Sequence, residues 1–224
     1  MSKKKGKNSN YKVELDENGA PVKKGEPIKS FLEKNQNILI ISLCAVLVIA
    51  LVVGVVLVMN PRDDVFVEMD FGDYGKVLIE VDRNAAPITA GHFISLVEDG
   101  FYDGLTIYRG QPGFVIQGGR KVGAELEAIE GEYALNGYNN PISHKRGVIS
   151  MVNDSETSEF FITLDDSAAE HFDGAYAAFG YIAEGMDVVE KIAEELKKHG
   201  KDEAGFVEDK YAITIVSAKI VNFN

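Results

Sequence analysis

The chain reads FYDGLTIYR at residues 101–109 and GFVIQGG at residues 113–119. Each piece is a short run of β-branched and aromatic residues bounded by glycine, which is typical of a β-strand. Runs of the same kind recur along the chain, at residues 65–81, 147–152, 160–163, 176–182 and 212–222. We therefore expect a mainly β domain built from many short strands.

Two helical patterns lie among these strands. The first opens at Pro87 and closes at Gly100, and the second runs from about Met186 to Lys198. Each has one apolar face, a proline or glycine boundary and a length typical of a helix. Short strands with two helices predict a closed eight-stranded β-barrel capped by two α-helices. The sequence has no linker rich in Pro, Gly or Ser after residue 64, so we expect one domain over residues 65–224.

An uncharged apolar block at residues 38–59 precedes this domain. Its length matches the ~20 residues that a helix needs to cross the hydrocarbon of a bilayer. The alternative is a cleavable signal peptide, but the block ends in LVMN, without a small-residue cleavage site. We predict an uncleaved transmembrane helix at 38–59, a cytoplasmic, Lys-rich and flexible tail at 1–37, and a short linker at 60–64.

Charge differs on the two sides of the block. Residues 1–37 carry nine lysines and five acidic residues, and the whole chain has a net charge of −12, so residues 60–224 carry −16. The lysines predict a cytoplasmic tail and an acidic domain on the outer side of the cell membrane. An acidic domain repels phosphate backbones, which argues against nucleic acid as a partner.

Several kinds of catalysis lack their sequence motifs. The histidines at 92, 144, 171 and 199 are too far apart for a zinc motif, and we assign His92 and His144 to structure. The sequence has no glycine-rich phosphate loop. Its one cysteine, Cys44, lies in the apolar block, so the domain has no thiol nucleophile. We therefore expect neither a metal nor a cofactor.

Several further motifs accompany the two pieces quoted first. They are APIT at 86–89, HKRGVISM at 144–151, EFFIT at 159–163, FDG at 172–174 and FG at 179–180. In this order and spacing the motifs resemble the cyclophilin family of peptidyl-prolyl cis-trans isomerases, over roughly residues 65–222. The segment from GEY at 131 to SM at 151 is similar to the compact bacterial branch. The resemblance implies rotation about Xaa–Pro bonds in proline-containing peptides and unfolded exported proteins.

Such a reaction has simple chemical needs. An Xaa–Pro bond rotates slowly because amide resonance resists twisting, with a barrier of ~18–20 kcal/mol. A catalyst must bind the twisted amide better than either planar form. It needs an apolar bed for the prolyl ring and a fixed donor for the nitrogen lone pair. Arginine is suitable because it stays charged and offers five donors in a rigid fork.

The resemblance also implies roles for particular residues. Arg109 matches the catalytic arginine, and Gln117 matches the glutamine that orients it and contacts substrate. Taken singly, Arg109 would be a surface residue and an aromatic such as Phe114 a core residue, but their joint spacing with Gln117 favours a groove. Substrate binding is implied for Phe114, Val115, Val152, Asn153, Glu159, Phe161, Phe172 and Tyr176.

Glu159 departs from the family pattern, in which most members have glutamine. We expect it either to pair with Arg109 and hold it or to favour basic peptides. Together with a short loop after Asn153, it supports an alternative function: a non-catalytic module that binds proline-containing segments as a holdase or scaffold. A third interpretation is a structural membrane protein whose tail recruits cytoplasmic partners.

Overall fold

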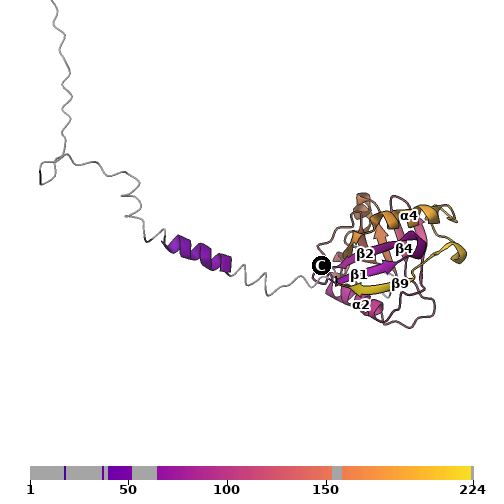
Figure 1. Cartoon of the computed structure of the whole chain (residues 1–224), viewed down its shortest axis with the longest axis horizontal. Coiled ribbons are helices and arrows are strands. Elements are labelled where there is room, and N and C mark those ends of the chain that lie inside the picture. The colour runs from indigo at the N-terminus through magenta and orange to yellow at the C-terminus, as the bar shows by residue number, and fades with distance from the viewer. Residues whose placement is uncertain (1–17, 19–36, 38–39, 52–64, 153–157, 223–224) are drawn as a thin grey trace, which may run out of the picture. The chain divides into compact units, whose positions relative to one another are not determined.

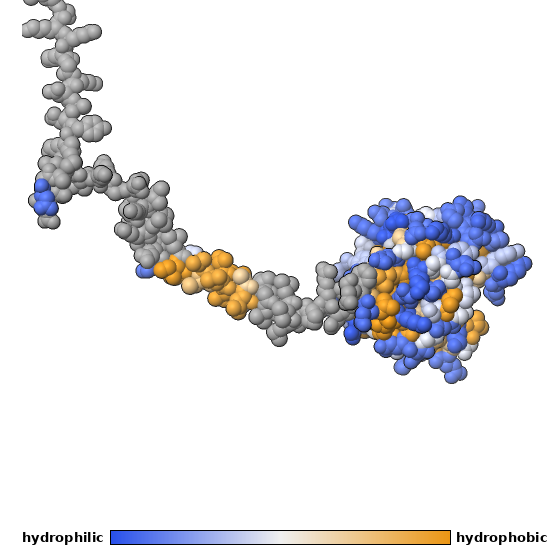
Figure 2. Space-filling model, viewed as in Figure 1, coloured by the Kyte–Doolittle hydropathy of each residue, from blue (hydrophilic) through white to orange (hydrophobic). Residues whose placement is uncertain are grey.

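The computed structural model describes residues 18, 37, 40–51, 65–152 and 158–222 (Figure 1). The chain divides into two compact units, Met1–Pro61 and Arg62–Asn224. In the first unit, residues 40–51 are helical and expose apolar side chains (Figure 2). Across the described residues, none of the helices combines the length and the apolarity that crossing a membrane requires. The other residues of the predicted span, 38–39 and 52–59, and the predicted linker lie outside the described residues, as does the predicted tail apart from residues 18 and 37.

The second unit is built on one antiparallel sheet, in agreement with the predicted mainly β fold. In its described part the strand order is β8-β3-β4-β6-β5-β7-β2-β1-β9. The strands are β1 (Val65–Asp70), β2 (Lys76–Val81), β3 (Thr106–Gln111), β4 (Val115–Gly118), β5 (Val148–Met151), β6 (Phe160–Thr163), β7 (Ala177–Glu184), β8 (Ile213–Thr214) and β9 (Ser217–Val221).

The last stretch of chain joins the two edges of this sheet. β8 pairs with β3, whereas β9 pairs with β1. Between them, the Ile215 amide donates to the Leu105 carbonyl and the Val216 amide donates to the Asp70 carbonyl, both at 2.8 Å. The sheet therefore curls round on itself. The predicted final strand, 212–222, is divided in two because it changes partner at this point, so the described residues form nine strands rather than eight.

The core fills the inside of the curled sheet. In the hairpin of β1 and β2, Val67 faces Ile79 and Met69 faces Val77, and all four side chains are fully buried. This is the alternation that a half-buried strand requires. Helix α2 (Pro87–Glu98) contributes Phe93, whose ring packs on three other buried aromatic rings, those of Tyr102, Phe160 and Phe179.

Helix α4 (Met186–Lys197) covers the opposite side from α2 in Figure 1 and contacts β2, β3 and β4. It comes very close to the middle of β3. A Cβ added at Gly110 would lie 2.6 Å from the Leu196 Cβ, so only glycine permits this approach. A third α-helix in the described part of this unit, α3 (Ala169–Phe172), is a single short turn before β7.

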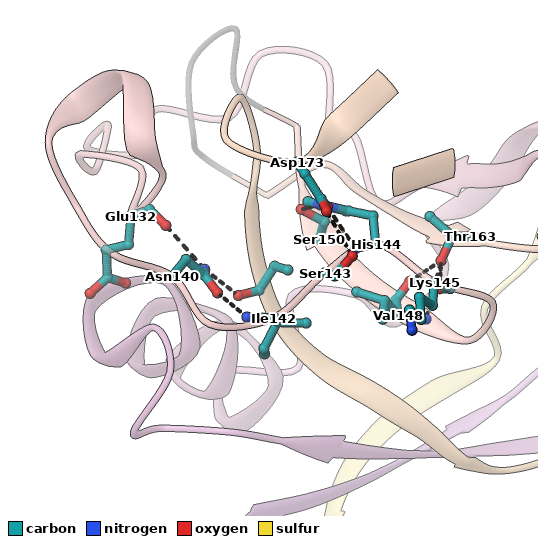
Figure 3. A network of polar contacts seen from close by, with 11 residues as sticks. Glu132, Asn140, Ile142, Ser143, His144, Lys145, Val148, Ser150, Thr163 and Asp173 are labelled. Atoms are coloured by element: carbon teal, nitrogen blue, oxygen red, sulfur yellow. Dashed lines mark hydrogen bonds and ion pairs between the residues drawn. The ribbon is translucent and has the colours of Figure 1, made fainter. Parts of the chain in front are cut away.

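A long loop, residues 131–143, is fastened to α2 and β7. The helix cap residue Ala86 has no side-chain acceptor, and the Thr89 amide instead donates to the buried Glu132 carboxylate at 2.8 Å. Asn140 donates to the carbonyls of Glu132 and Ala178, at 3.0 and 2.8 Å (Figure 3). A carboxylate at a helix N-terminus accepts a hydrogen bond from an otherwise unpaired amide and interacts favourably with the positive end of the helix dipole.

We predict that Glu132→Ala lowers the free energy of unfolding by about 1–2 kcal/mol, as expected for the loss of a helix cap. Urea denaturation of residues 62–224 measures the change. Glu127→Ala removes an exposed carboxylate from the same region and serves as the control. Equal stability of the two variants would contradict the capping role.

Candidate active site

Three neighbouring strands place an arginine, a glutamine and a phenylalanine in one row. Arg109 in β3 lies opposite Gln117 in β4, and Gln117 lies opposite Phe161 in β6. Directly opposed residues project from the same face of a sheet. Ile116, the neighbour of Gln117, belongs to the core. The row therefore occupies the outer face.

A β-bulge in β3 brings a second side chain to the same glutamine. Ile107 pairs with Gly118 and Arg109 pairs with Gln117, so Tyr108 is the extra residue. The Gln117 amide nitrogen donates to the Tyr108 hydroxyl at 3.2 Å, and Arg109 Nη1 donates to the Gln117 carbonyl at 2.9 Å. The sequence did not predict this role of Tyr108, which fixes the orientation of the Gln117 amide.

Arg109 is held by further contacts. Its Nε donates to the Ala204 carbonyl at 2.8 Å, and its Nη2 donates to Gln111 Oε1 at 3.4 Å. The ring of Phe206 lies 5.2 Å from the guanidinium carbon, within cation–π range. Half-burial lowers the pKa of Arg109, with Asp202 acting in the opposite sense. Because an arginine pKa starts so high, the side chain stays charged.

An aromatic cluster of Phe114, Phe161, Phe172 and Tyr176 shares Phe161 with this row. Phe172 is its centre, with ring centroids 5.2 Å from Phe114, 4.7 Å from Phe161 and 5.2 Å from Tyr176. The rings of His171 and Phe114 form a T-shaped pair, with their centroids 5.6 Å apart. Four of the eight predicted substrate-binding residues thus form one contiguous apolar group beside the predicted catalytic arginine.

The other predicted binding residues are placed differently. Val115 lies opposite Thr163, on the same face of the sheet as Gln117, and both side chains are fully buried. Its role in substrate binding stays a prediction, and in this structure other side chains cover Val115. Val152 is partly exposed, and its amide donates to the Glu159 carbonyl at 2.8 Å. Asn153 lies outside the described residues.

Glu159 contacts Gln117, the residue that accepts a hydrogen bond from Arg109. Its carboxylate accepts a hydrogen bond from the Gln117 amide nitrogen at 3.3 Å, so it acts on Arg109 through Gln117. This differs from the direct pairing that was one of the two expectations. Burial raises the pKa of Glu159.

A polar network supports the aromatic cluster (Figure 3). His144 stacks on Phe161, with ring centroids 5.8 Å apart. Its Nδ1 lies 2.8 Å from Asp173 Oδ1 and its Nε2 lies 3.1 Å from Ser150 Oγ. The carboxylate accepts, so Nδ1 carries the proton and Nε2 accepts from the hydroxyl. His144 and Ser150 are closed to substrate at 1% and 0% exposure, so this group positions the cluster rather than attacking a substrate.

The arrangement offers donors and an apolar bed but no metal ligands. Among the described residues there is no group of three His, Cys, Asp or Glu side chains that could hold a metal ion. Rotation about a single bond requires only that the twisted form be bound better than the planar one.

Comparison with known proteins identifies the family. Residues 66–220 match the family described as cyclophilin type peptidyl-prolyl cis-trans isomerase/CLD. This chain belongs to the cyclophilin-type peptidyl-prolyl cis-trans isomerases. The peptidyl-prolyl cis-trans isomerase of Acinetobacter baylyi is 39% identical over 53% of this chain and 67% of its own length. That of Helicobacter pylori strain 26695 is 36% identical over 54% of this chain and 76% of its own length.

A solved cyclophilin has the same fold. The Cryptosporidium parvum cyclophilin-type isomerase superposes with a TM-score of 0.58 at 21% identity, and the match covers 71% of this chain and 99% of that one. The solved chain therefore consists of a cyclophilin domain and almost nothing else. Residues 62–224, which form one compact unit with a single main core, are expected to fold in the same independent way.

The buried histidine makes the stability of this cyclophilin domain depend on pH. Burial lowers the pKa of His144 from 6.5, against the opposing effect of Asp173. The unfolded chain therefore takes up a proton first as pH falls through 6.5, and stability is lost from there down to the native pKa.

We predict that, as pH is lowered from 6.5 towards the native pKa of His144, the free energy of unfolding falls by up to about 1.4 kcal/mol per pH unit. His144→Gln, which keeps hydrogen-bonding groups but does not titrate, should have a shallower slope in urea denaturation. Parallel slopes for the variant and the wild type would show that His144 does not titrate on unfolding.

Proposed function

We propose that this chain isomerises Xaa–Pro bonds in unfolded exported proteins while anchored in the cell membrane, with the isomerase domain on the outer side and the tail in the cytoplasm. The observation that carries the catalytic part is the charged Arg109, held by Ala204, Gln117 and Gln111 beside the aromatic cluster. This geometry combines a rigid donor with an apolar surface.

The mechanism depends on the number of N–H donors that the Arg109 guanidinium has left for a substrate. A guanidinium group has five N–H donors, and three are used within the protein. Counted over the described residues, one N–H on each terminal nitrogen remains for the substrate. With the prolyl ring on the aromatic cluster, such a donor stabilises the nitrogen lone pair that appears when rotation ends conjugation. The planar amide has no such lone pair, so the twisted form gains more from the contact.

The ligand class is Xaa–Pro segments. A second structure of the Cryptosporidium parvum protein was determined in the presence of the dipeptide Ala-Pro, at 24% identity and a TM-score of 0.56. We extend the same class to this chain because its aromatic cluster and Arg109 suit a prolyl ring and its amide.

The anchor is supported by two features of the first unit. Residues 38–59 carry no charge, and residues 1–37 before them carry nine lysines against five acidic residues, whereas residues 60–224 carry a net charge of −16. The helical residues among 40–51 expose large apolar side chains, with Ile41, Leu43 and Leu51 each more than 60% exposed. A helix that is apolar all round is suited to lipid rather than to water.

We predict that residues 62–224 accelerate cis/trans exchange of a short Xaa–Pro peptide, measured by NMR exchange spectroscopy. Arg109→Ala should lower the rate about 10²–10³-fold, the usual cost of one lost electrostatic donor. Arg83→Ala removes an exposed arginine elsewhere and should leave the rate unchanged. Full activity in Arg109→Ala would contradict the mechanism, whereas peptide binding without exchange in the wild type would favour the binding module.

For the anchor, we predict that the full chain stays in the membrane pellet of bacterial cells after alkaline extraction. Protease added outside spheroplasts should digest the isomerase domain and spare a tag at residue 1. Residues 62–224 alone, expressed in the same way, should be extracted. If alkaline extraction releases the full chain from the membrane pellet as it releases residues 62–224, the proposed anchor is overturned.

A further inference from the structure

A small pocket adjoins the aromatic cluster and shares Tyr176 with it. It has a volume of about 240 Å³, and its lining includes Tyr133, Tyr138, Asn139, Ser143, Asp173 and Tyr176. Pockets for drug-sized ligands span roughly 300–1,000 Å³. This one is therefore of a size for a single side chain.

The pocket is formed before any ligand arrives. One wall is the loop at 131–143, which Glu132 and Asn140 fasten to α2 and β7. The Leu135 amide donates to the Gly174 carbonyl at 3.0 Å, which ties this loop to the opposite wall. A rigid pocket binds without the cost of ordering its own walls.

Asp173 supplies a fixed negative charge in this pocket. Its carboxylate accepts from the Ser143 hydroxyl at 2.6 Å and from the backbone amide and ring of His144, both at 2.8 Å. The side chain is still 42% exposed. Burial would raise the pKa of Asp173, but the hydrogen bonds outweigh it and lower the pKa. A carboxylate has about four acceptor sites, so one remains for a ligand.

We propose that this pocket is a subsite for a lysine or arginine side chain of the peptide whose proline lies on the aromatic cluster. The proposal rests on the proposed peptide site. Asp173 follows Phe172 in the chain, and Tyr176 belongs to both the cluster and the pocket, so one extended peptide reaches both. The tyrosine rings offer faces to the cation and its stem. The Glu130 carboxylate, which accepts a hydrogen bond from the Tyr138 hydroxyl, adds a negative charge near the pocket.

The test uses matched peptides and residues 62–224. The peptides form a series, and each has one Xaa–Pro bond and one lysine. The position of the lysine differs from peptide to peptide, from two residues before the bond to three residues after it. A second set has norleucine in place of lysine, which keeps the stem and removes the charge. NMR titration gives the dissociation constants. We expect lysine to bind about three- to tenfold more tightly than norleucine at one position, as for a partly exposed ion pair with an aromatic contact.

Three variants locate the effect. Asp173→Asn should abolish the lysine preference, and Glu98→Gln, an equal loss of charge at the exposed end of α2, should keep it. Asn139→Lys puts a cation in the pocket wall without touching the hydrogen bonds of Asp173 and should also abolish the preference. A preference that survives in both pocket variants, or no preference at any position in the wild type, overturns the proposal.

The norleucine peptides separate this proposal from the peptide site itself. They should bind the wild type and the pocket variants equally and shift the signals of Phe161 and Tyr176. Norleucine peptides that bind without shifting these signals would contradict the peptide site. If the norleucine peptides shift the signals of Phe161 and Tyr176 but lysine peptides bind no more tightly than norleucine peptides, the subsite alone is contradicted.

Discussion

The register of β3, β4 and β6 is the constraint on which the site depends. A slip of one residue would turn Arg109, Gln117 and Phe161 into the core and expose their apolar neighbours, such as Ile116 and Ile162. The burial of those neighbours therefore fixes the outer row as well. The bulge at Tyr108 adds the one irregularity that the row needs, since it brings a hydroxyl and a guanidinium to the same glutamine.

Local features of the site could be predicted from the sequence. Arg109, Phe114 and Gln117 all lie in one hairpin, formed by β3, β4 and the turn between them, so their spacing in the sequence indicates their proximity in the fold. The strand count could not be predicted in the same way. The apolar pattern runs on through Ile215 and Val216, and a change of pairing partner leaves no mark in such a pattern.

Contacts made by distant backbone could not be predicted either. Ala204 lies 95 residues from Arg109 and binds it through a carbonyl, a group that every residue has. The one signal was Phe206 with Val207, an apolar pair in an otherwise charged stretch. The burial of Val115 was missed for a related reason, because alternation tells which face a side chain occupies and not what covers that face.

The charges around the arginine act at two ranges. Screening at physiological ionic strength has a length of about 8 Å, so the charge of −16 over residues 60–224 mainly attracts basic segments to the surface. Turnover depends on contacts within a few ångströms. A carboxylate paired directly with Arg109 would occupy the donors that the twisted amide needs. Glu159 is one hydrogen bond removed, on Gln117, so it orients the amide that holds Arg109 and leaves the remaining guanidinium donors for the substrate.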